Sequence, residues 1–189
     1  MWHYYMKETP KENQIRENAN KIRAEIIGKA IEVEDALTLT LGYLYCPLRK
    51  SQYVYLLVED ILTDLTFEKK IKIFKKFVTS FPSSFSHQAE IMNYLNEIRE
   101  KRNNLAHRNI RLPWIFGEED INDEGYNKLT NEYVDWMEKC EFIKPGKSTI
   151  TISIKEINAF KNLCDLTVFI IFEGLNNIMS LDEGNNNAT

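Results

Sequence analysis

The residues best suited to chemistry in this 189-residue chain lie at positions 102–107 and read Arg-Asn-Asn-Leu-Ala-His. Arg102 interrupts an apolar pattern with the 3–4 spacing of one helix face, formed by Ile91, Leu95, Ile98 and Leu105. Burying an arginine without a partner is very costly. We therefore expect Arg102 to meet a carboxylate, a subunit interface or an anion.

Asn103 and His107 are four residues apart, so they share a face of the same predicted helix, and Arg102 is adjacent to Asn103. A guanidinium group can hold a phosphate through two parallel hydrogen bonds, and a neutral imidazole can accept or donate a proton near pH 7. Together these groups suit transesterification at an RNA phosphodiester without a metal ion or a cofactor. The candidate catalytic residues are Arg102 and His107, with Asn103 assisting.

The charge around this cluster differs in sign from that of the whole chain. Residues 99–111 contain five positive residues and one negative residue, a local charge of +4 in a chain of net charge −4, so the remainder carries −8. Such a chain cannot coat nucleic acid through its net charge, but it can hold one phosphate site. Arg99, Arg108 and Arg111 are candidate substrate-binding residues, although Arg108 and Arg111 could equally be ordinary surface residues.

The elements that must position these residues are mainly helical. Apolar residues at spacings of three and four predict helices over about 13–45, 51–65, 66–81 and 86–108, with Thr66 and Ser86 as N-caps. Ser153 and Glu156 fit a capping box that opens a last helix. The predicted fold is a mainly α, up-and-down bundle of about five helices.

A small β-hairpin is expected within residues 141–154, just before the last helix, because Ile150, Ile152 and Ile154 alternate with polar residues. The acidic stretch 117–125 reads as an exposed loop. We expect one domain over residues 1–182 and a disordered tail over 183–189. The lysine-rich side of the third helix, residues 68–76, is most simply a solvated face.

Several classes of protein are disfavoured by the composition. Cys46, Cys140 and Cys164 are far apart and have no zinc-site spacing, so we expect no metal, small core cysteines and a reducing cytoplasm. The N-terminal residues lack the apolar core of a signal peptide, and the longest apolar run, residues 168–172, is too short to span a bilayer. We therefore expect no membrane association.

The pattern Arg102-Asn103-x-x-Ala-His107 at the end of a helix resembles the Arg-x4–6-His motif of HEPN-domain proteins, in which a polar residue commonly follows the arginine. The resemblance implies a helical bundle that forms a homodimer, with both copies of the motif lining one cleft. It implies metal-independent endoribonuclease activity, often of a toxin or antiphage-defence effector, and an antitoxin or regulatory protein as a possible partner.

Simpler interpretations remain open for the same residues. Arg102 could pair with Glu32, Glu34 or Asp35 on the first helix, and His107 could be a histidine favoured by the dipole of a helix C-terminus. The alternative function is therefore a non-catalytic HEPN-like module that binds nucleotide or RNA, or that only dimerises. A weaker possibility is a helical scaffold that contacts a protein partner through the acidic loop.

Overall fold

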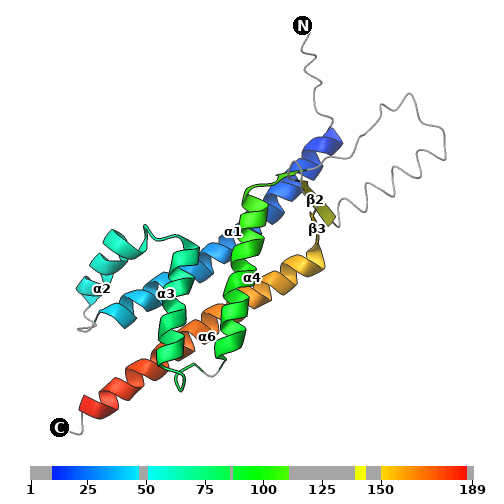
Figure 1. Cartoon of the computed structure of the whole chain (residues 1–189). Helices are drawn as coiled ribbons and strands as arrows, with labels where there is room; N and C mark the ends of the chain where they lie inside the picture. Colours follow the sequence, from blue (N-terminus) through cyan, green and yellow to red (C-terminus); the bar gives the residue numbers. More distant parts are fainter. Residues whose placement is uncertain (1–9, 47–50, 86, 111–138, 144–149, 187–189) are drawn as a thin grey trace, which may run out of the picture. The chain divides into compact units, whose positions relative to one another are not determined.

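The protein is mainly helical, as predicted, with a small antiparallel sheet before the last helix (Figure 1). The computed structural model describes residues 10–46, 51–85, 87–110, 139–143 and 150–186. The elements in chain order are α1 (Pro10–Tyr45), α2 (Ser51–Leu57), η1 (Val58–Leu62), α3 (Phe67–Ser80), α4 (Gln88–Ala106), β1 (Asn109–Ile110), β2 (Lys139–Ile143), β3 (Ile150–Ser153) and α6 (Ile154–Asn186). The predicted acidic loop 117–125, the Ser86 cap and Arg111 lie outside the described residues.

The chain divides into two compact units. Unit 1 comprises Met1–Ile26 and Asn104–Ala159, and unit 2 comprises Ile27–Asn103 and Phe160–Thr189. The three long helices α1, α4 and α6 each contribute residues to both units. The prediction of one domain over residues 1–182 stays a prediction.

Unit 2 is a helical bundle whose apolar core comes from α1, α3, α4 and α6. The apolar spacing noted in the sequence is the buried face of each helix, because one side of a 3.6-residue helix must be removed from water. Its fully buried large side chains include Leu37, Leu41, Phe74, Ile91, Leu95 and Ile98. Phe85, also buried, packs edge-on against Phe74 at a ring-centroid distance of 5.4 Å.

The segment after α1 departs from a single regular helix. The sequence predicted one helix over 51–65, whereas the structure has the short α2 followed by the π-helical turn η1. The backbone N–H and the hydroxyl of Thr63 both donate to the carbonyl of Val58, at 2.9 and 2.7 Å, which closes this wider turn. A side chain at Gly42 of α1 would collide with Val58, so the glycine permits close packing of this segment on α1.

Helix α3 begins where the sequence predicted. The hydroxyl of Thr66 accepts a hydrogen bond from the backbone N–H of Lys69 at 3.3 Å, so Thr66 is the N-cap. The helix ends at Ser80, before Pro82, also as expected.

Unit 1 contains the predicted hairpin and one strand that the sequence did not indicate. Strands β2 and β3 pair antiparallel, with Cys140 opposite Ile152 and Phe142 opposite Ile150. The two-residue β1 adds to the other edge of β2, giving the order β1-β2-β3. Phe142 is fully buried, so the hairpin is anchored by packing rather than standing alone in water.

Helix α6 opens with the predicted capping box. The carboxylate of Glu156 accepts from the backbone N–H of Ser153 at 2.7 Å, and the hydroxyl of Ser153 accepts from the backbone N–H of Glu156 at 3.3 Å. The prediction that Ile154 belongs to the strand was wrong, because this cap makes it the first residue of α6, where it is 54% exposed. The helix continues through Asn186, so the predicted disordered tail is helical as far as that residue.

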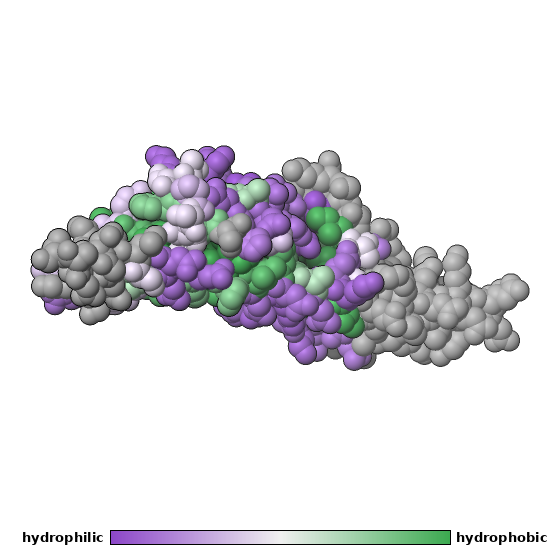
Figure 2. Space-filling model, turned by 90° about the horizontal axis from the view of Figure 1, so that it is seen from below, coloured by the Kyte–Doolittle hydropathy of each residue, from purple (hydrophilic) through white to green (hydrophobic). Residues whose placement is uncertain are grey.

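Part of α6 has an unusually apolar composition. Among the described residues, the segment Ile154–Ser180 alone is long and apolar enough to cross a membrane, by length and composition only. This segment contains charged residues between its apolar ones, so it is not an uninterrupted apolar run, and the absence of membrane association stays a prediction. A buried core helix passes the same test, and residues such as Phe160, Cys164 and Ile171 are buried. Figure 2 shows hydrophobic surface between hydrophilic regions on one face of the molecule.

Candidate functional site

Arg102 lies on the buried side of α4, as its interruption of the apolar pattern predicted. The neighbouring positions Ile98 and Leu105 are at most 2% exposed, whereas the side chain of Arg102 keeps 30% of its surface exposed. The guanidinium group is therefore half-buried and still reaches solvent. It requires a partner on its buried side.

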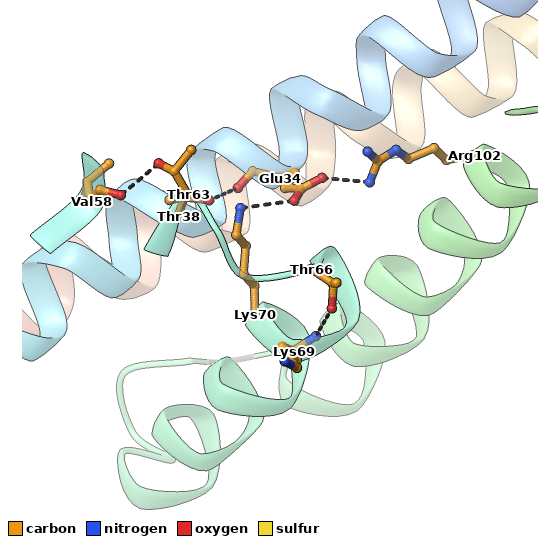
Figure 3. A network of polar contacts seen from close by, with 8 residues as sticks. All are labelled: Glu34, Thr38, Val58, Thr63, Thr66, Lys69, Lys70 and Arg102. Carbon is orange, nitrogen blue, oxygen red and sulfur yellow. Dashed lines mark hydrogen bonds and ion pairs between the residues drawn. The ribbon is translucent and has the colours of Figure 1, made fainter. Parts of the chain in front are cut away.

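That partner is Glu34 of α1, one of the three acidic residues that the sequence offered (Figure 3). Arg102 Nη1 donates to Glu34 Oε2 at 2.7 Å, and Lys70 Nζ donates to Glu34 Oε1 at 3.0 Å. The side chains of Glu34 and Lys70 are 13% and 5% exposed. One carboxylate thus bridges two cations from two other helices, and the three charged groups sum to +1.

Helix geometry explains why Glu34 is selected. Residues Val33 and Leu37 of α1 are fully buried, and Glu34 lies beside them at the edge of that face. Glu32 instead points to solvent, with a side chain 59% exposed and paired to Lys29 at 2.7 Å. Asp35 is also exposed.

Helix α3 supplies a second contact to the arginine. The guanidinium carbon of Arg102 lies 5.9 Å from the centre of the Phe67 ring, within the range of a cation–π interaction. Phe67 is the first residue of α3, directly after the Thr66 cap, so the start of that helix determines where the ring sits. Glu34 and Phe67 together restrict the orientation of the guanidinium group.

Asn103 and His107 are both exposed. The sequence predicted that the helix carrying them would run to about residue 108, but α4 ends at Ala106, and His107 lies in the turn that follows. Arg102 and Asn103 belong to unit 2 and His107 belongs to unit 1. A single site that joins the three side chains therefore stays a prediction.

The additional arginines differ in exposure. Arg108 is 7% exposed, so it is not an ordinary surface residue, and its backbone carbonyl accepts a hydrogen bond from the guanidinium of Arg23. The Arg23 guanidinium also lies 5.3 Å from the centre of the Phe142 ring. The side chain of Arg99 is 24% exposed and lies 3.7 Å from Glu100. Roles for Arg99, Arg108 and Arg111 in phosphate binding stay predictions.

Lys70 is the site residue that sequence reasoning missed. The prediction that the lysines of residues 68–76 form a solvated face is wrong for Lys70, which is 4% exposed. The available signal was its spacing, because Phe67, Lys70, Ile71 and Phe74 follow the pattern of one helix face. Lys72 does lie in solvent, where its ion pair with Glu68 at 2.7 Å lowers the pKa of the Glu68 carboxyl.

Comparisons with protein-family models, curated proteins and solved structures found no match to this chain. The described residues contain no group of three histidine, cysteine or acidic side chains placed to hold a metal ion. The functional assignment of the candidate site therefore depends only on the chemistry and geometry of its own residues.

Proposed function

We propose that this protein is a metal-independent endoribonuclease of the HEPN type that acts as a homodimer. The observation that carries the proposal is Arg102, a partly exposed guanidinium held by Glu34 in the middle of an otherwise apolar helix face. It belongs to a sequence pattern in which an exposed asparagine and an exposed histidine follow at the spacing of the HEPN motif. The fold in which this pattern lies is a helical bundle, as that family would require.

The proposed chemistry is intramolecular transesterification of RNA. His107 removes the proton from a ribose 2′-hydroxyl, the 2′-oxygen attacks the adjacent phosphorus, and the bond to the 5′-oxygen of the next nucleotide breaks. The protonated histidine then returns a proton to the departing 5′-oxygen. Arg102 stabilises the extra negative charge on the phosphorane-like transition state, and Asn103 donates a hydrogen bond to the phosphate. The products are a 2′,3′-cyclic phosphate and a 5′-hydroxyl.

Glu34 acts in this proposal as a positioning residue. Its carboxylate fixes one nitrogen of Arg102, and Lys70 shares the same carboxylate, so the site retains a charge of +1 that favours a phosphate. A fully neutralised arginine would attract an anion less strongly.

The test is cleavage of a fluorescently labelled RNA by the purified protein in the presence of EDTA. We expect 2′,3′-cyclic phosphate ends, and a loss of cleavage of at least a hundredfold in both His107→Ala and Arg102→Ala. The matched control is His87→Ala, because His87 is also an exposed histidine but pairs with Glu90 in the first turn of α4. Full cleavage by His107→Ala would exclude the mechanism.

The biological role follows from the same activity. We propose a cytoplasmic toxin or defence effector that an antitoxin or regulatory protein restrains. Expression of the wild-type chain is then expected to arrest growth, and expression of His107→Ala is not. Normal growth with abundant wild-type protein would count against a toxin.

The ion pair of Arg102 with Glu34 favours a second candidate, a non-catalytic module that binds RNA or nucleotide. Such a module needs the cationic site but no proton transfer. It would bind labelled RNA without cutting it, and His107→Ala would then leave the affinity unchanged while Arg102→Ala would weaken it.

A further inference from the structure

Unit 2 carries an apolar groove between α1 and α6 that the proposed active site does not use. The groove has a volume of about 560 Å³. Its apolar lining comes from Ala36 and Leu39 of α1 and from Val168 and Phe172 of α6. Leu39 is 41% exposed, so this lining is open to solvent.

The apolar surface continues along α6 beyond the groove. Phe169 is 63% exposed and, together with Phe172, lines a second hollow of about 300 Å³. A large exposed aromatic side chain beside an apolar groove is the arrangement that interfaces use for an anchoring contact. The same helix is the most apolar of α1, α3, α4 and α6, which fits a face that meets another molecule.

The groove and the second hollow share a border of carboxylates. Glu32 and Asp35 of α1 and Asp165 of α6 line the groove, and Glu173 of α6 lines the second hollow. Lys29 is paired with Glu32 at 2.7 Å and with Asp165 at 3.1 Å, and these two carboxylates raise its pKa. Four carboxylates and one ammonium group leave the border with a charge of −3.

We infer that this groove binds an amphipathic α-helix of a protein partner whose apolar face is flanked by lysine or arginine. Leucine-sized side chains of such a helix would fill the groove and cover Phe169, and its flanking cations would meet the acidic border. Anchors at i, i+3 or i+4 and i+7 of the partner helix match a groove that runs along two helices.

The charge of the border distinguishes this occupant from two others. A second copy of this chain would bring another border of charge −3 against the first, and like charges across an interface are unfavourable. An anionic membrane would be repelled for the same reason. Binding of a cationic amphipathic helix is favoured both by contact with the apolar lining and by attraction to the acidic border.

The test uses a fluorescein-labelled 18-residue helical peptide with leucines on one face and lysines beside them, with binding measured by fluorescence anisotropy. We expect a saturable complex that Leu39→Glu weakens at least tenfold and Asp35→Lys weakens severalfold. The matched controls are Leu56→Glu and Asp60→Lys, at exposed positions of α2 and η1 outside the groove, and neither should change the affinity. A second peptide with glutamates in place of the lysines should bind at least tenfold more weakly.

Four results would overturn the inference. Equal binding by the groove variants and their controls would show non-specific attraction to an acidic protein. Absence of binding would show that the groove does not bind a cationic amphipathic helix. Conversion of a dimer to a monomer by Leu39→Glu would identify the groove as the interface between copies. Cosedimentation with phosphatidylcholine vesicles that Leu39→Glu abolishes would identify it as a membrane contact. RNA cleavage is measured separately on the same variants and does not depend on the groove, so this inference and the proposed function can fail independently.

Discussion

At the scale of single residues, the decisive arrangement is one carboxylate shared by two cations. Glu34 pairs with two cations that differ in burial: Arg102 is half-buried and still reaches solvent, whereas Lys70 is buried. Removing the carboxylate would leave Lys70 as a buried, uncompensated charge, and such a change is costly. The same residue thus serves stability through Lys70 and the proposed chemistry through Arg102.

Glu34→Gln is expected to lower the free energy of unfolding by about 3 kcal/mol, because breaking a buried ion pair strands the remaining charge. Urea unfolding followed by circular dichroism measures the change. The matched control is Glu32→Gln on the same helix, whose exposed pair with Lys29 should contribute less than about 1 kcal/mol. Equal unfolding midpoints for the two variants would contradict this account of Glu34.

A second residue-scale prediction concerns Cys164. Burial, and then the negative charge of Asp165, raise the pKa of its thiol from 9.0 to about 12. At pH 8.5 we expect its alkylation by iodoacetamide to be about a thousandfold slower than that of an ordinary thiol, because the thiolate is the reactive form. Mass spectrometry of the labelled peptides measures the rate at this one site, with protein unfolded in urea as the control.

The sign of the pH effect follows from the same shift. The thiol ionises above about pH 9 in the unfolded chain but stays protonated to about pH 12 in the folded one, so its contribution to folding is present below pH 9 and is lost as the pH rises. Rapid labelling of Cys164 in the folded protein at pH 8.5 would disprove its burial.

At the scale of elements, close packing of α6 depends on a residue without a side chain. A Cβ atom added at Gly174 would overlap the ring of Phe85, which is 2% exposed and packs edge-on against Phe74. The glycine therefore determines how closely α6 approaches the segment that precedes α4.

Gly174→Ala is expected to destabilise the protein by about 2 kcal/mol, since a buried aromatic ring must move to admit the methyl group. Gly28→Ala is the matched control, because Gly28 also lies within a helix but has no neighbouring atom within 4 Å of an added Cβ. There the better helix propensity of alanine should stabilise by about 0.5–1 kcal/mol. Thermal unfolding of both variants measures these changes in stability. An increase in stability for Gly174→Ala would contradict the close packing of α6 against Phe85.

At the scale of the whole molecule, charge is unevenly distributed. The chain carries −4 overall, the segment 99–111 carries +4, and the border shared by the α1–α6 groove and the second hollow carries −3. A chain of net negative charge disfavours general RNA binding, so the proposed RNA site depends on the local positive charge of residues 99–111. Two copies of that segment facing each other would double the local charge without making the whole assembly basic.

We therefore expect sedimentation equilibrium to give twice the chain mass of 22.3 kDa. RNA cleavage should fall as salt is raised from 50 to 300 mM, because the phosphate contacts are electrostatic. Cleavage of RNA at full rate by a monomer would show that the proposed mechanism does not require a dimer.

Much of the fold could be predicted from local patterns. The apolar spacing indicated α1, α3, α4 and α6, and the Thr66 cap and the Ser153–Glu156 capping box located two helix starts. These features depend on residues within one or two turns of each other, so the sequence alone determines them. The strand β1 was not predictable, because it depends on pairing with the distant β2. No local pattern indicated the π-helical turn η1, which packs on α1 at Gly42.

The candidate site divides in the same way. The sequence determined that Arg102 needs a partner, since its position on an apolar face follows from helix periodicity alone. Only the tertiary structure decided that this partner is Glu34 and not Glu32 or Asp35. It also decided that Lys70 pairs with the same carboxylate, although the other lysines of α3 lie in solvent. The physical reason is that burial of a charge is a property of the packed helices, and no single helix contains the information about which neighbour will cover it.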